Sequence, residues 1–122
     1  MGIMQLDIEV WLRGDDFATN QLVDVPVAEP VGWSDGDVRL VLEALLRAID
    51  HARHPDAEPD RPVALRGFNW IVNPFEGGVL VSVEIQLGAA AAGPFRVDQG
   101  QLEAMIGRVI AQGSGPQSAR VH

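Results

Sequence analysis

The feature that most constrains the fold is a regular alternation of apolar and polar residues in two stretches of the chain. In residues 4–12 every even position is apolar, and in residues 79–87 every odd position is apolar. The side chains of a β-strand point alternately to its two faces, so this period of two predicts two strands with one face in a core. Both strands should therefore belong to a sheet that is buried on one side only.

The order strand, strand, helix occurs twice along the chain. Predicted strands cover residues 5–13, 21–28, 63–73 and 79–87, and predicted helices cover residues 38–53 and 99–112. Each helix carries an apolar stripe at spacings of three and four residues, which needs a surface to pack on. The sequence therefore predicts an α+β fold, a two-layer sandwich in which a four-stranded, mainly antiparallel sheet carries both helices on one face. The ββαββα order indicates a pseudo-twofold repeat.

Both helices begin with a recognisable capping signal. Ser34 and Asp37 have the spacing of a capping box, with Asp in place of the usual Glu, and Trp33 before them is suited to a hydrophobic staple. Asp98 is the predicted cap of the second helix, with Gln101 at the box position.

Two segments of the second half are harder to assign. Residues 88–94 form an alanine run between glycines that ends in a proline, and this composition favours a loop. Residues 73–78 predict a hairpin with a four-residue loop, which places Phe68 and Trp70 in the core. A shift of one residue would place both aromatic rings on the open face, so both alternatives remain.

The length and the linkers predict one domain over residues 1–112. Its halves, roughly 1–54 and 62–112, are joined by a connector at 55–61 that is rich in proline and acidic residues. Residues 113–122 have a flexible composition without periodicity, so a disordered C-terminal tail is expected.

The charge excludes some classes of partner. The formal net charge is −8, and all nine basic residues are arginine. An acidic chain without a basic stripe repels a phosphate backbone, so we expect no nucleic-acid binding. The absence of cysteine fits a reducing cytoplasm, and the use of Arg without Lys is typical of a GC-rich bacterial genome. Charged residues interrupt every apolar run, so we expect no membrane span. The N-terminal residues lack the pattern of a signal peptide, so we expect no secretory signal.

One cluster has residue types that bind metals. Asp50, His51 and His54 lie within one helical turn of each other at the end of the first predicted helix. Imidazole and carboxylate groups can bind a divalent metal, but such a site needs more ligands. The competing interpretation is a charge pattern that suits the negative end of the helix dipole.

Other polar groups permit chemistry only on weaker grounds. Asp15 and Asp16, together with Asp7 or Glu9, could form a carboxylate pair for acid–base work, although adjacent acidic residues in a loop usually diverge. Ser34 and Ser82 lie in no nucleophile motif. We therefore expect no catalytic residue and no cofactor.

The remaining candidate is a surface, formed by the polar face of the predicted sheet. Trp11 projects there beside Asp7 and Glu9, and Glu84 lies on the matching face of the second hairpin. A large aromatic side chain in this position needs either a partner or a covering segment, for which Phe17 or the alanine run are available.

These observations favour a small acidic cytoplasmic module for protein interaction, such as an adaptor, an assembly component or an immunity-type protein, without catalytic activity. Its partner would be a protein, for which the acidic surface favours a basic one, and covering of the open face or of an edge strand by a second copy predicts a homodimer. The alternative is a small-molecule or metal-binding protein, or an enzyme, that uses a cavity between sheet and helices.

Overall fold

The structure is a computed structural model that describes the backbone of residues 2–57 and 63–121, with side chains described up to residue 112. It has an α+β fold with one antiparallel sheet of five strands and two α-helices. The strands are β1 (Met4–Leu12), β2 (Thr19–Val25), β3 (Asn69–Phe75), β4 (Gly78–Ile85) and β5 (Gly88–Phe95). The helices are η1 (Pro30–Gly32), α1 (Asp35–Arg53) and α2 (Gln99–Val121).

The predicted class is therefore confirmed, whereas the predicted four strands and the ββαββα order are wrong. The alanine run forms the fifth strand, β5, instead of a loop. The strand order in the sheet is β2-β1-β5-β4-β3, so β5 lies in the centre and pairs with both β1 and β4. The halves contribute two and three strands, which removes the predicted pseudo-twofold repeat.

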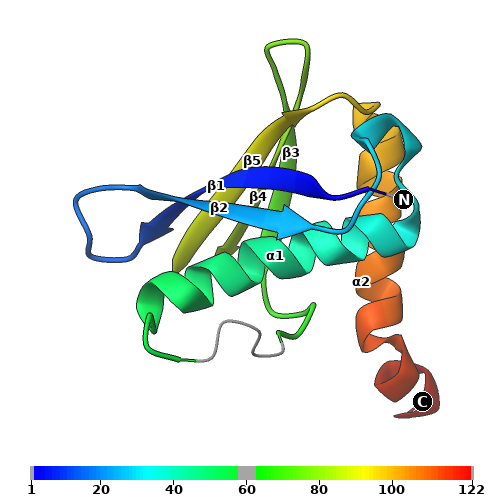
Figure 1. Ribbon diagram of the computed structural model, residues 1–122. Coiled ribbons are helices and arrows are strands. Elements are labelled where there is room, and N and C mark those ends of the chain that lie inside the picture. The colour runs from blue at the N-terminus through cyan, green and yellow to red at the C-terminus, as the bar shows by residue number, and fades with distance from the viewer. Residues whose placement is uncertain (1, 58–62, 122) are drawn as a thin grey trace.

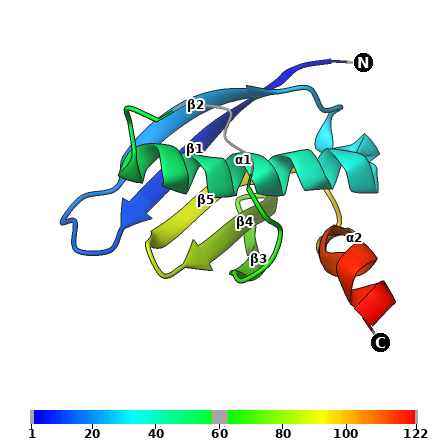
Figure 2. The same ribbon diagram turned by 90° about the horizontal axis from the view of Figure 1, so that it is seen from below.

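Both helices lie on the same side of the sheet (Figures 1 and 2). Helix α1 runs across strands β1, β2, β4 and β5, and α2 packs against α1 and the edge strand β3. The Gln99 side-chain amide also donates to the backbone oxygen of Val72 at 3.0 Å, so α2 caps part of the β3 edge. No helix or strand of the described chain covers the opposite side of the sheet (Figure 1).

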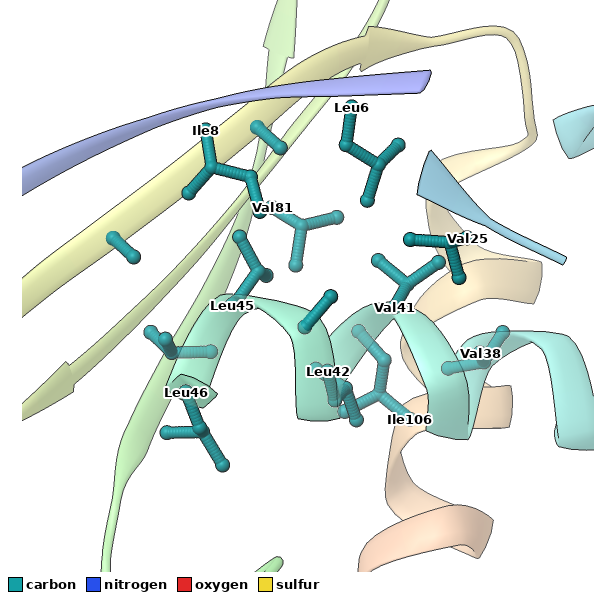
Figure 3. Packing of buried hydrophobic residues seen from close by; sticks show 14 of the residues in the cluster. Leu6, Ile8, Val25, Val38, Val41, Leu42, Leu45, Leu46, Val81 and Ile106 are labelled. Atoms are coloured by element: carbon teal, nitrogen blue, oxygen red, sulfur yellow. The ribbon is translucent and has the colours of Figure 1, made fainter. Parts of the chain in front are cut away.

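The core lies between the sheet and the helices. Leu6 and Ile8 of β1 point towards Val41 and Leu45 of α1 (Figure 3), and all four are fully or almost fully buried. Ile106 adds the apolar stripe of α2 to the same cluster. No polar or charged side chain among the described residues is buried, so an aliphatic interior holds the two layers together.

The second hairpin keeps the predicted faces with a different turn. Phe75 pairs with Gly78, which leaves a two-residue loop of Glu76 and Gly77 instead of the predicted four. Both loop residues have positive φ, at 47° and 83°, as the tight turn between twisted antiparallel strands requires. The register differs from the prediction by an even number of residues, so Trp70 still lies on the core side, partly buried.

Helix capping follows the prediction at α1. The Ser34 hydroxyl accepts from the Asp37 amide at 3.3 Å, and the Asp37 carboxylate accepts from the Ser34 amide at 3.1 Å. The buried Trp33 ring packs on the Phe95 ring, with 4.9 Å between the ring centroids, and its indole nitrogen donates to the Ala28 carbonyl. At α2, Asp98 accepts from the Gln101 amide at 2.9 Å, as predicted for the cap.

Some predictions fall outside the described residues. Most of the predicted connector at 55–61 does so, and it stays a prediction. Helix α2 runs to Val121, past the predicted helix end at residue 112, and disorder of the tail at 113–122 stays a prediction. Residues 63–68, predicted as the start of the third strand, precede β3, and Gly67 there has a left-handed φ of 73°.

Candidate functional site

The structure brings the predicted surface residues together on the uncovered face of the sheet. Asp7, Glu9 and Trp11 alternate along β1 with the buried residues of the core face. Trp11 pairs with Ala89 of β5, and Ala89 pairs with Glu84 of β4. Because directly paired residues of a sheet point to the same face, all four candidates share one surface. We call this surface the open face.

Trp11 remains accessible on the open face, with 43% of its surface exposed. Neither covering segment considered from the sequence reaches over it. Phe17 is itself 79% exposed in the loop between β1 and β2, and the alanine run lies beside Trp11 in the sheet as β5. The alternative in which one of these segments buries Trp11 is therefore wrong.

A second large apolar side chain, Ile71 of β3, is exposed on the same face to 53%. It pairs with Ser82, which pairs with Ala91, which pairs with Glu9. Ile71 is not among the residues predicted for this surface, although its position between the core-side residues Trp70 and Val72 indicates an outward side chain. Alternation along β3 was the signal that could have identified it.

Between Trp11 and Ile71 the open face is hollowed. The hollow has a lining that includes Trp11, Ile71, Ser82, Glu84 and Ala89. Its floor contains the small side chains of Ala89 from β5 and Ser82 from β4, and Glu84 of β4 lies beside Ala89. We call this hollow, together with Ala91, which pairs with Ser82 on the same face, the trough, and we call Trp11 and Ile71 its walls.

The electrostatic character of the open face is acidic. Glu84 is exposed and Glu9 is half-buried, while the Asp7 carboxylate accepts a hydrogen bond from the Asn20 side chain of β2 at 2.8 Å. Among the described strand residues that point to this face, none is basic. Arg13, directly after β1, donates from Nε to the Gln86 carbonyl at 2.8 Å.

The histidine cluster lies at the C-terminal end of helix α1. His51 is exposed in the last turn of α1, and His54 is the C-cap residue, whose backbone amide donates to the Asp50 carbonyl at 2.8 Å. Within the described residues, no group of three or more His, Asp or Glu side chains is placed to hold a metal ion. The cluster therefore provides part of a helix terminus, and metal binding there stays untested.

The remaining polar candidates are dispersed. Asp15 and Asp16 are exposed in the turn after β1, whereas Asp7 is engaged with Asn20 on the open face. Ser34 caps α1, and Ser82 forms part of the trough floor. Another hollow lies beside Met4, Val27 and Pro94, and the charged groups of its described lining are Arg96 and Glu29. These residues form no recognisable catalytic arrangement.

The α-helices that the structure describes include none with the length and apolar character needed to cross a membrane. Comparison with known protein families, with curated proteins and with solved structures gave no significant match.

Proposed function

We propose that the protein is a non-catalytic interaction module that binds a protein partner through the open face of its sheet. The observation that carries this proposal is the exposure of Trp11 and Ile71 on either side of a small-residue floor. Large side chains of this kind are the usual anchors of protein interfaces, and an exposed apolar patch with a polar surround is typical of a binding surface.

The charge of the chain supports a basic partner. The net charge of −8 and the carboxylates of Glu9 and Glu84 favour association with a positively charged surface. The absence of cysteine is consistent with a cytoplasmic setting. In this role the protein would act as an adaptor, an assembly component or an immunity-type protein.

A ligand-binding or catalytic role has less support. The interior between sheet and helices is filled by aliphatic side chains, and no polar or charged side chain of the described residues is buried there. An enzyme or small-molecule site needs convergent polar groups in a concave pocket. A thermal-shift screen with metals and metabolites tests this alternative, since a ligand at one hundred times its Kd stabilises by about 2.7 kcal/mol.

A pull-down from cells of the source organism, with mass spectrometry, tests the proposed role. Wild-type protein should retain a partner, Trp11→Ala should lose most of it, and recovery should fall as salt rises. Phe17→Ala is the matched control, because Phe17 is more exposed than Trp11 but lies in the loop away from the trough. Recovery that is insensitive both to Trp11→Ala and to salt would contradict the proposal.

A further inference from the structure

The trough has a cross-section set by the sheet. Its walls, Trp11 on β1 and Ile71 on β3, are separated by the two strands β5 and β4. Neighbouring strands lie about 4.8 Å apart, so β1 and β3 are roughly 14 Å apart across the sheet, with Trp11 and Ile71 in adjacent rows of paired residues. An α-helix with its side chains has a diameter of about 10–12 Å, which this width accommodates along the direction of β5. The small side chains of Ala89, Ala91 and Ser82 let such an element approach the sheet closely.

The backbone of the trough argues against an extended partner. Strands β5 and β4 each have a neighbour on both sides, so their backbone amides and carbonyls are already used inside the sheet. An extended peptide gains its affinity from backbone hydrogen bonds at a free sheet edge, which this face does not offer. A helix satisfies its own backbone groups and docks through side chains, so it suits a sheet face.

The charges and the floor define what the helix carries. Glu9 borders the trough on the β1 side, and Glu84 lies in the row that joins Trp11 to Asn69. A floor of small side chains has to be filled by larger apolar residues from the partner. A complementary helix therefore presents Leu, Ile or Met towards the floor and Lys or Arg along its flanks.

A second copy of this chain is a poor occupant. It would place carboxylates against carboxylates if the two open faces met, since no described strand residue of this face is basic. Helix α1 is buried against its own sheet, and over residues 99–112, where the side chains of α2 are described, no fully exposed residue of α2 is a large aliphatic one that could fill the trough. The predicted homodimer stays a prediction that needs another surface.

We propose that the trough binds an amphipathic α-helix of a different polypeptide, with a stripe of large aliphatic residues flanked by Lys and Arg. This inference rests on the proposed interaction role and specifies the class of partner. It commits to a helix on the face of the sheet, in contrast to a strand at its edge.

Selection from two display libraries tests the proposal on the purified full-length chain. One library is a helical scaffold with a randomised face, whose flanking positions encode Lys, Arg, Glu, Asp and Gln at equal frequency. The other displays linear peptides of the same coding composition. We expect the binders to come from the helical library, with aliphatic residues on the central stripe and Lys or Arg enriched at the flanks.

Variants of the trough then locate the binding. Two substitutions should each raise the Kd of the selected helices by about tenfold or more: Ile71→Asp, and Ala91→Leu, which adds a larger side chain to the floor. Glu84→Lys should shift selection towards acidic flanks. Phe17→Ala should leave Kd unchanged within about twofold, as expected for a residue outside the interface. Circular dichroism and amide NMR spectra of each variant establish that its fold is retained.

The outcomes separate the two proposals. Two results would contradict the proposal that the partner is a basic amphipathic helix. One is selection of linear binders that map to the β2 or β3 edge, and the other is selection of helices with acidic flanks on the wild-type protein. If linear binders instead compete at Trp11 and Ile71, the interaction role stands and the helix is wrong. If no binder from either library is sensitive to Ile71→Asp or to Ala91→Leu, both proposals fail.

Discussion

Trp11 and Glu84 lie on opposite sides of Ala89 in one row of paired residues across three strands. The alanine between them is small enough to leave both side chains accessible from the same direction. The next pair along the same two strands joins Leu12 to Gly88, the first residue of β5. The position of Trp11 therefore depends on how closely β5 approaches β1.

Gly88 is the position at which this approach is tested most directly. A Cβ atom there would collide with the backbone carbonyl of Trp11. We expect Gly88→Ala to lower the free energy of unfolding by about 1–3 kcal/mol, because the backbone must shift to relieve the overlap. Urea denaturation followed by circular dichroism measures the change, and tryptophan fluorescence reports the displaced indole.

Gly107→Ala is the matched control, since the same atom added on the exposed side of α2 meets nothing within 4 Å. It should raise the free energy of unfolding by about 0.5–1 kcal/mol, because alanine loses less backbone entropy in a helix than glycine. Equal effects of the two substitutions would show that the strand β5 is not packed as described.

Ile106 and Ile71 form a matched pair for the two faces of the fold. Ile106 is fully buried between the helices and the sheet, whereas Ile71 is 53% exposed on the open face. Ile106→Ala should cost about 2–5 kcal/mol because it leaves a cavity. Ile71→Ala should lower the free energy of unfolding by about 1 kcal/mol or less, because it changes only the strand propensity on a solvated face. Equilibrium unfolding in urea checks both, and a larger loss at Ile71 would contradict the assignment of the faces.

The capping box of α1 makes a separate contribution. Ser34→Ala removes the acceptor for the Asp37 amide, so the free energy of unfolding should fall by about 1 kcal/mol. Ser82→Ala is the control, because Ser82 lies on the trough floor, away from any helix start. Thermal unfolding of both variants measures the difference, and the same melting temperature for both would argue against the cap.

The pair Asp35–Arg108 predicts a pH dependence. The Arg108 guanidinium donates to both carboxylate oxygens of Asp35 at 2.9 Å and links α1 to α2. These hydrogen bonds lower the pKa of Asp35 below its ordinary value. A group whose pKa is lower in the folded state stabilises the fold above its unfolded-state pKa, and that contribution is lost as the pH falls through the folded-state pKa.

An NMR titration of the Asp35 carboxyl carbon checks this prediction. In Arg108→Gln the midpoint should rise towards the ordinary value for aspartate, and less stability should be lost on acidification. Arg13→Gln, which changes an arginine whose Nε donates to the Gln86 carbonyl, should leave the Asp35 midpoint where it is. An identical midpoint in wild type and Arg108→Gln would show that the two side chains are not paired in solution.

The parts of the fold that sequence could predict are those in which the two faces differ in chemistry. Alternation identified β1 and β4, and the stripes and caps identified α1 and the start of α2, because each of these elements separates apolar from polar residues. Strand β5 has no such contrast. Ala90 and Ala92 are buried while Ala89 and Ala91 face outward, so one residue type occupies both faces and the period of two is invisible.

The candidate site shows the same limit. Trp11, Asp7 and Glu9 could be placed on one face from β1 alone, and Glu84 from β4, but their distance apart depends on the strand that lies between them. Without β5, neither the floor nor the separation of Trp11 from Ile71 could be derived. The turn at Glu76 also needed the structure, since Pro74 and Gly77 are compatible with loops of several lengths.

The pairing of β1 with β5 joins the first and the last strand in chain order, with Leu12 opposite Gly88. A chain emerging from the ribosome cannot complete this pairing until β5 has been made, so the first hairpin and α1 wait with an unpaired strand and an uncovered apolar surface. Division of the chain between α1 and β3 gives two pieces that each hold a complementary edge of the same interface. We therefore expect that neither piece alone forms the complete sheet, because the pairing of β1 with β5 requires both.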